Sequence, residues 1–391
     1  MSDKLKKNAA RSSAAMTKKT WSYWERDLIP SKQELIVVGA GFTGLSAAIH
    51  AKMNHPKWKV LVLERAVYAE GASTKNAGFA CYGTLGEIQA DIGTMGRDLA
   101  FSLLRQRLEG LRFLKDLVGS ANMDFQVLGG TELFLKGEEE AAQNANGIME
   151  HVNDEFIDLN QGAPLFQRRA VQKSFSNIIQ AVYSPLEAQL HPAKALSVLE
   201  LKAEDLGITI LKGVEVKAQE GLKDYWRLRT SAGSWQCKKL LYCTNAFGIN
   251  GTSLDISPAR NQVLITKAFN HGLNAGNYHA QEGYIYFRTV KDRLLIGGAR
   301  HLDAENETTN ELGLNQFLQS HLQDFLDQHL NLKGRYEIDQ QWSGIIATAK
   351  SKEPIVEELE SNLWYCGRFG GMGVALSAIT GKRAADLLDG N

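Results

Sequence analysis

The feature that most constrains the fold of this chain lies at residues 34–53, which read ELIVVGAGFTGLSAAIHAKM. LIVV is a short apolar run with β-branched residues, which is typical of a strand buried in a parallel sheet. Gly39, Gly41 and Gly44 follow with the spacing G-x-G-x-x-G, and LSAAIHAKM continues as a helix with small residues on one face. A strand, a glycine turn and a helix in this order predict a unit that binds a dinucleotide.

Each glycine in this turn has a separate physical role. Gly39 permits the tight turn, Gly41 lets the backbone approach a pyrophosphate, and Gly44 lets the helix pack closely on the strand. The pyrophosphate is expected at the helix N-terminus, where free N–H groups and the helix dipole favour an anion. Phe42 and Thr43 stand in the same turn and belong to the predicted cofactor site.

The segment after the turn separates FAD from NAD. A second strand, WKVLVLE, ends at Glu64, where the motif expects an acid for the ribose hydroxyls; this acid disfavours NADP. Arg65 follows, and then GASTKNAGFACYG stands where an NAD enzyme usually continues with another strand and helix. Such a loop suits a pyrophosphate and an isoalloxazine ring lying along the backbone. Its predicted cofactor contacts are Ser73, Thr74, Asn76, Ala77 and Gly78.

The far end of the chain repeats the pattern. Residues 364–388 read WYCGRFGGMGVALSAITGKRAADLL, so a strand runs into Gly370, Gly371, Met372 and Gly373 before a helix begins near Val374. The N-terminus of that helix supplies positive potential, which would stabilise the negative charge of a reduced flavin. A chain that opens and closes with such turns predicts a discontinuous cofactor domain with the substrate domain inserted in it.

Together these motifs resemble those of the FAD-dependent amine oxidoreductases of the D-amino-acid oxidase, glycine oxidase and sarcosine oxidase superfamily. GASTKNAG is similar to the GAS-x-RN-x-G loop of the branch that contains gamma-glutamylputrescine oxidoreductase, LLYCTNAF resembles a family strand, and GRFGGMGVALSAITGK resembles the closing motif. The resemblance implies an α/β plus α+β fold, with a Rossmann-like, glutathione-reductase-like FAD-binding domain and an inserted mixed-sheet substrate domain. It adds Val216, Thr244 and Asn245 to the FAD-binding residues.

We expect three parts in the chain. Residues 1–30 form a basic N-terminal tail and an aromatic segment, WSYWERDLI, which should dock on the body. The tail is interpreted as disordered, with organellar targeting or contact with an anionic surface as alternatives. The FAD-binding domain is expected at 31–90, 185–255 and 340–391, and the substrate domain at 91–184 and 256–339. The leucines of residues 95–119 predict an amphipathic helix. ARNQVLITKAF, GYIYFRTVKDRLLIGGA and YEIDQQWSGIIATAK predict strands of one sheet.

The predicted sheet carries the candidate substrate contacts. Tyr286 and Arg288 share one face, because strand side chains alternate. The resemblance implies substrate contacts there, and Arg288 would pair with a carboxylate; a solvated strand charge is the alternative. Trp342 and Arg300 are further candidates. His191 begins a helix beside a proline, which suits capping or packing more than catalysis.

Several positions depart from the family pattern. Lys75 stands near the position where some relatives carry a histidine linked to the flavin, and WSGIIATAK lacks the cysteine of others, so non-covalent FAD is expected. Leu295 matches the position of the lysine with which sarcosine oxidases activate oxygen. Gly370 or Gly371 lies where glycine oxidase carries a carboxylate-clamping arginine. An oxidase and a dehydrogenase both remain open.

Composition excludes other classes of function. The 391 residues have a net charge of zero and a pI of about 7.1, which argues against nucleic acid as the main partner. The four cysteines form no C-x-x-C pair and are typical of reduced thiols in a cytoplasmic protein. The nine histidines show no metal-ligand spacing, so no metal site is expected. No apolar run reaches transmembrane length.

The resemblance therefore implies an FAD-dependent amine or amino-acid oxidoreductase. Hydride would pass from a C–N-bearing carbon to flavin N5, the resulting imine would hydrolyse, and O₂ or another acceptor would reoxidise the flavin. The alternatives are a dehydrogenase that uses a quinone or carrier protein, an oxidase domain acting on a modified tRNA base, and a non-catalytic flavoprotein. The neutral charge argues against the tRNA alternative. The sequence leaves the oligomeric state open.

Overall fold

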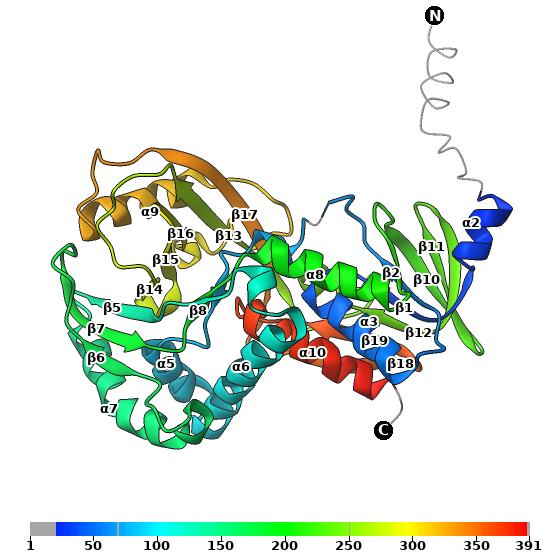
Figure 1. Ribbon diagram of the computed structural model, residues 1–391, viewed down its shortest axis with the longest axis horizontal. Helices are drawn as coiled ribbons and strands as arrows, with labels where there is room; N and C mark the ends of the chain where they lie inside the picture. The colour runs from blue at the N-terminus through cyan, green and yellow to red at the C-terminus, as the bar shows by residue number, and fades with distance from the viewer. Residues whose placement is uncertain (1–20, 69, 250, 389–391) are drawn as a thin grey trace, which may run out of the picture.

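The computed structural model describes residues 21–68, 70–249 and 251–388. Two large sheets lie toward opposite ends of the long axis of the molecule (Figure 1). The first sheet contains the predicted dinucleotide-binding unit, in which β1 pairs in parallel with both β12 and β2. Its strands are β1 (Lys32–Val38), β2 (Val60–Leu63), β9 (Thr209–Leu211), β10 (Val216–Leu222), β11 (Tyr225–Thr230), β12 (Gly233–Tyr242), β18 (Ile355–Glu360) and β19 (Leu363–Gly367).

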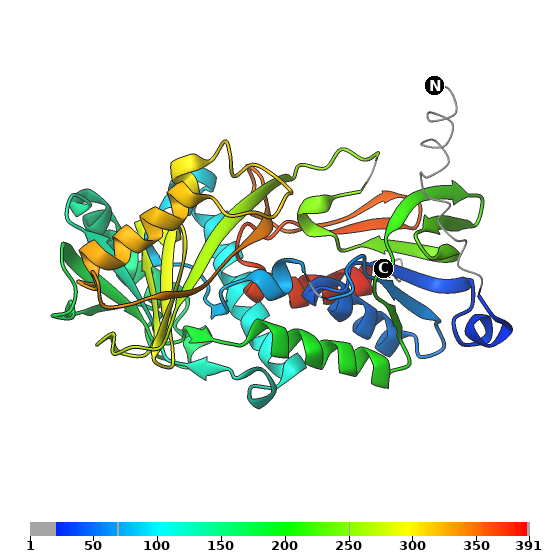
Figure 2. The same ribbon diagram turned by 90° about the horizontal axis from the view of Figure 1, so that it is seen from above.

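Three helices cover one face of this sheet (Figure 2). They are α3 (Phe42–Asn54), α8 (Pro192–Asp205) and α10 (Gly373–Leu387). Leu35 and Val37 of β1 belong to the core on this side, whereas Ile36 of the same strand packs with Trp226 and Trp235 on the other. Both faces of β1 are therefore buried, as its continuous apolar run predicts.

The second sheet contains the three segments that were expected to pair. Its strand order is β17-β13-β16-β15-β14-β5-β7-β6. The strands are β5 (Gly130–Leu135), β6 (Gln167–Arg169), β7 (Ile178–Ser184), β13 (Ser257–Thr266), β14 (Asn277–Ala280), β15 (Ile285–Val290), β16 (Arg293–Gly298) and β17 (Ile338–Thr348). Helix α9 (Gln316–His329) packs on the face that carries Phe287 and Ile296. Tyr286 and His279 consequently point away from α9, because neighbouring strand residues face opposite sides.

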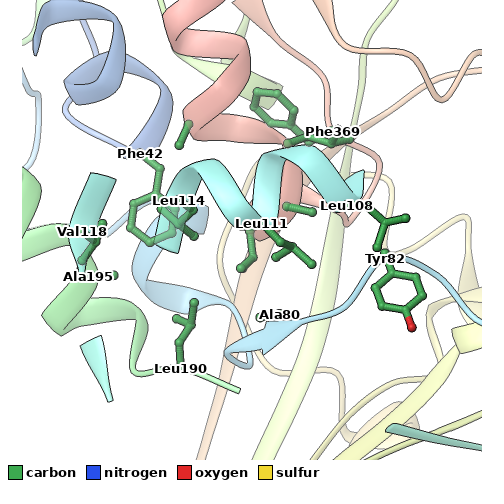
Figure 3. Close-up of a cluster of buried hydrophobic side chains, with 14 of the residues drawn as sticks. Phe42, Ala80, Tyr82, Leu108, Leu111, Leu114, Val118, Leu190, Ala195 and Phe369 are labelled. Carbon is green, nitrogen blue, oxygen red and sulfur yellow. The ribbon is translucent and has the colours of Figure 1, made fainter. Parts of the chain in front are cut away.

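The remaining elements include a third, small sheet and further helices. A small sheet joins β3 (Phe79–Ala80), β8 (Ala188–Gln189) and β4 (Gln126–Val127). The other helices are α4 (Ala72–Lys75), α5 (Leu85–Met95), α6 (Arg97–Val118) and α7 (Glu139–Glu155). The predicted leucine-rich helix is α6, and its Leu108, Leu111 and Leu114 join a core cluster with Phe42 and Ala80 (Figure 3).

The aromatic segment near the N-terminus contacts the first sheet through Trp21, whereas Tyr23 and Trp24 are exposed. The indole Nε1 of Trp21 donates a hydrogen bond to the backbone oxygen of Ala232 at 2.7 Å, and its ring packs edge-on against Trp235. Helix α2 (Tyr23–Leu28) follows. The expected basic tail, residues 1–20, lies outside the described residues. Within the described part of the chain, no helix is both long and apolar enough to cross a membrane.

The observed elements confirm the α/β plus α+β class, with a Rossmann-like sheet and a second, mixed sheet. The division into domains stays a proposal. Since β17 pairs with β13 throughout its length, the last boundary of that proposal, drawn at residue 340, is better placed after Thr348, where β17 ends.

Candidate functional site

A cavity of about 1050 Å³ extends from the β1–α3 turn to the inner face of the second sheet. Segments that are far apart in the sequence form its wall. The wall includes most of the predicted cofactor residues: Gly39, Gly41, Phe42, Thr43, Glu64, Arg65, Ser73, Asn76, Ala77, Gly78, Val216, Thr244, Asn245, Gly370, Gly371, Met372 and Gly373. Of the predicted set, Gly44 and Thr74 do not line it.

The glycine turn has the close contacts that its spacing requires. Gly39 has a φ of +106°, and a side chain there would meet the backbone oxygen of Cys243 at 2.7 Å. A Cβ on Gly44 would lie 1.9 Å from the oxygen of Gly39, so Gly44 acts through packing of α3 and needs no contact with the cofactor. The N-terminus of α3 opens into the cavity, where the Ser73 hydroxyl accepts a hydrogen bond from the Phe42 N–H at 3.0 Å. That hydroxyl retains its own hydrogen to donate to an anion.

Glu64 is held rigidly at the end of β2. Its two carboxylate oxygens accept hydrogen bonds from the backbone N–H groups of Ala40 at 3.0 Å and Ala66 at 2.9 Å. Each oxygen keeps a further lone pair, which can accept from a ribose hydroxyl. The neighbouring Arg65 stacks its guanidinium on the Phe247 ring at 3.9 Å. This end of the cavity therefore fits an adenosine ribose.

A second helix N-terminus meets the cavity at Gly373, where α10 begins. Helices α3 and α10 cross in close contact, because a Cβ on Gly381 would lie 2.4 Å from the oxygen of Thr43. The Ser46 hydroxyl also donates to the Ala378 oxygen at 2.6 Å. The crossing brings the N-termini of two helices to one cavity. Their positive potential suits the negative charges of the pyrophosphate and of the reduced flavin ring of FAD.

Side-chain hydrogen bonds fix the segment of small residues at 71–78. Asn76 donates from Nδ2 to the oxygens of Ala72 and Ser73, and its Oδ1 accepts from the Gly78 N–H at 2.9 Å. The indole of Trp342 donates to the Lys75 oxygen at 2.9 Å. Trp342 thus fixes this loop from β17, and it does not line the cavity.

The opposite wall comes from the second sheet. Tyr286 lies over Gly297, since a Cβ on that glycine would be 2.7 Å from the tyrosine ring, and it packs edge-on against Phe79. Burial raises the pKa of Tyr286 to about 12, so the phenol is a neutral hydrogen-bond donor. Arg300 also lines the cavity, from the short helix Arg300–Asp303, and makes no hydrogen bond or ion pair with any described residue.

Arg288 is neither a substrate contact at the cavity wall nor a solvated charge on a strand, which are the two environments expected from the sequence. It is 8% exposed and does not line the cavity. Its Nη1 donates to Gln189 Oε1 at 2.8 Å, and its guanidinium lies against Gly78, where a Cβ would be 2.8 Å from Nη2. Burial lowers the pKa of Arg288 to about 10. His191 caps α8, because its Nδ1 accepts from the Lys194 N–H. Leu295 is buried in an apolar cluster of the second sheet.

The structure adds charged residues that the sequence analysis did not single out. Glu87, Asp91 and Lys352 line the cavity, and the Lys352 ammonium lies 2.5 Å from an Asp91 oxygen and 3.3 Å from Glu87. Arg107 is buried beside Glu87 at 3.1 Å. Burial raises the pKa of Glu87, but the two neighbouring cations outweigh it and the pKa lies below its usual value. Glu87 and Asp91 lie one turn apart on α5, but Arg107 comes from α6 and Lys352 from the segment after β17, so no sequence spacing indicated the cluster as a whole.

The fold and this cavity fit a protein that binds FAD. Comparison with known proteins agrees. The chain belongs to the DAO family of FAD-dependent oxidoreductases, which it matches over residues 34–387. Members of this family act on amines or amino acids. Among the residues that the structure describes, no cluster of three or more His, Cys, Asp or Glu is placed to hold a metal ion.

Similar sequences and structures cover nearly the whole chain. Gamma-glutamylputrescine oxidoreductase of Escherichia coli is 23% identical over 378 residues, which are 92% of this chain and 84% of that protein. The probable oxidoreductase OrdL of Haemophilus influenzae is 22% identical over 377 residues, or 92% of this chain and 83% of OrdL. Glycine oxidase from Geobacillus kaustophilus has a TM-score of 0.73 at 20% identity, covering 92% of this chain and 95% of its own. L-Proline dehydrogenase from P. horikoshii has a TM-score of 0.72 at 17% identity, and the match covers 92% of this chain and 94% of that one.

Proposed function

We propose that the protein oxidises the C–N bond of a small amine or amino acid, giving an imine that hydrolyses in water. The observation that carries this proposal is that one cavity is lined both by the predicted FAD-binding residues and by Tyr286 and Arg300. Bound FAD would supply the hydride acceptor. The protein itself aligns the substrate at the reacting carbon.

We further propose that the substrate carries a carboxylate. Arg300 is a cation at the cavity wall with no anionic partner among the described residues, and a guanidinium binds a carboxylate through paired, charge-assisted hydrogen bonds. The Tyr286 phenol beside it is a second donor. The relatives of known structure include enzymes named for glycine and L-proline, which both bear a carboxylate beside the amine nitrogen.

The binding mode of FAD is proposed to be non-covalent. Cys81 lines the cavity, but burial raises the pKa of its thiol well above the usual value, so the nucleophilic thiolate is disfavoured. Cys366 is buried and donates to the Thr380 oxygen. The electron acceptor is O₂ or another small molecule or carrier, and Leu295 provides no charge that favours one of them.

The experiment that tests this proposal compares matched substrates without oxygen. The FAD-loaded protein is mixed with D- and L-amino acids, N-methyl amino acids and gamma-glutamyl polyamines, each paired with the same amine lacking the carboxylate, and the absorbance of oxidised flavin is followed. We expect bleaching by at least one amino acid and much weaker bleaching by its decarboxylated partner. Recovery in air identifies an oxidase, and persistence identifies a dehydrogenase. No bleaching by any amine would refute C–N oxidation.

A further inference from the structure

A buried histidine–glutamate pair lies at the cavity wall, apart from the residues that fit FAD. His279 on β14 lines the cavity and is 5% exposed, and Glu187 behind it is 1% exposed. Their atoms Nε2 and Oε2 are 2.8 Å apart. Among the described residues, Glu187 is the one hydrogen-bond partner of the His279 ring, so the second ring nitrogen, Nδ1, is left for a ligand.

The neighbouring strands place further titratable groups around this pair. Glu132 on β5 and Tyr286 on β15 stand directly opposite His279 in the two adjacent strand registers. Glu132 is buried and accepts two hydrogen bonds, one at each oxygen, from the Gly86 N–H at 3.1 Å. Phe79 of β3 packs edge-on against the His279 ring. The two neighbouring strands, the Phe79 ring and the Glu187 carboxylate therefore fix the position of His279.

The electrostatic surroundings make His279 a stronger base than an ordinary histidine. Burial lowers the pKa of its imidazole, but the carboxylates of Glu187, Glu132 and Glu87 outweigh burial and raise that pKa above its usual value. Burial also raises the pKa of Glu132 to about 7. Cys81, which lies near Glu187 and Glu87, keeps its proton because burial raises the pKa of its thiol. A histidine that is more basic than usual is better matched to the proton of an ammonium group.

We propose that His279 is the base that receives a proton from the substrate ammonium, and that Glu187 orients its ring and compensates the imidazolium. The inference rests on the proposed function. An N–H bond of the ammonium breaks, a bond forms between that proton and Nδ1, and the freed electron pair stays on the amine nitrogen. Glu187 accepts the hydrogen bond from Nε2–H throughout. The neutral amine can then assist departure of hydride from its carbon, which an ammonium cannot.

Tyr286 connects this base to the proposed carboxylate site. It stands opposite His279 on the neighbouring strand, and the positive charge of Arg300 lies close enough to lower its pKa against the larger effect of burial. One wall of the cavity thus presents a base, a phenol and a guanidinium. An α-amino acid has its ammonium and carboxylate next to each other, and this wall has a group suited to each.

The test uses His279→Gln, whose amide can still donate to Glu187 but cannot take the proton, and His329→Gln as the control. His329 packs on Phe325 at the end of α9 and does not line the cavity. The limiting rate of anaerobic flavin reduction is measured from acid to alkaline pH in the FAD-loaded proteins. We expect His279→Gln to lose roughly 100-fold or more at neutral pH and to approach the wild-type rate above the pKa of the amine. The control should follow the wild type throughout.

A second readout does not depend on turnover. The histidine ring signals of the FAD-bound protein are titrated by NMR, with the His279 signal assigned by its loss in His279→Gln. Glu187→Gln should lower the pKa of His279 by roughly one unit or more. An equal loss of rate at every pH in His279→Gln, or an unchanged His279 pKa in Glu187→Gln, overturns the proposal. If no amine reduces the wild-type flavin, the proposed function has failed, while the titration still decides whether Glu187 sets the basicity of His279.

Discussion

Replacing Gly44 with alanine probes the contact on which the cofactor turn depends. The new Cβ would stand 1.9 Å from the Gly39 oxygen, whereas real Cβ contacts stay above 3.0 Å, so the N-terminus of α3 must move away by about 1 Å. Backbone shifts forced by overpacking cost about 1–3 kcal/mol. We expect the upper end, since both atoms belong to the backbone and no side-chain rotation relieves the clash. A cost of about 3 kcal/mol corresponds to a change of roughly 150-fold in an equilibrium constant.

Two measurements follow this cost. Thermal unfolding should begin at lower temperature, and the rise in melting temperature on adding FAD should shrink, because that rise depends on the affinity for FAD. Gly147→Ala is the matched control: Gly147 lies within α7, has no neighbouring atom within 4 Å of a new Cβ, and should gain up to about 1 kcal/mol from helix propensity. A Gly44→Ala protein that melts and binds FAD like the wild type would refute the close packing of α3.

Three further outcomes are expected. Arg300→Gln should weaken binding of carboxylate-bearing amines by roughly 10- to 100-fold in anaerobic flavin titrations, and equal weakening for amines without a carboxylate would contradict the clamp. Because the pKa of Glu132 is raised from 4.5 to about 7 in the folded state, stability should be full below pH 4.5 and fall as pH rises to 7, by on the order of 3 kcal/mol; urea unfolding of Glu132→Gln should show a smaller fall. Lys352→Gln removes one of the two cations beside Asp91 and should cost about 1 kcal/mol, because Lys352 is partly exposed and screened; unchanged urea unfolding would contradict this.

Local sequence patterns brought most of the predicted cofactor positions to one cavity, and their contacts with FAD stay a prediction. Glycine spacing, an acid at a strand end and a loop of small residues depend on short-range backbone geometry, so seventeen of the nineteen predicted cofactor positions line the cavity. The two exceptions, Gly44 and Thr74, lie within the predicted segments. The substrate half was predicted less well. Tyr286 lines the wall as expected, but Arg288 is buried against Gly78, and its Nη1 donates to Gln189 of β8.

The sequence by itself determined the elements and their order, because strand alternation, helix periodicity and turn chemistry are properties of neighbouring residues. It therefore sufficed for the FAD-binding turn, the leucine-rich helix and the strands of the second sheet. Only the tertiary structure decided which charged groups meet. His279 and Glu187 are 92 residues apart, and Arg107 reaches Glu87 from a separate helix. Such pairs form where packed sheets and helices bring distant segments together, and the spacing of neighbouring residues in the sequence cannot predict them.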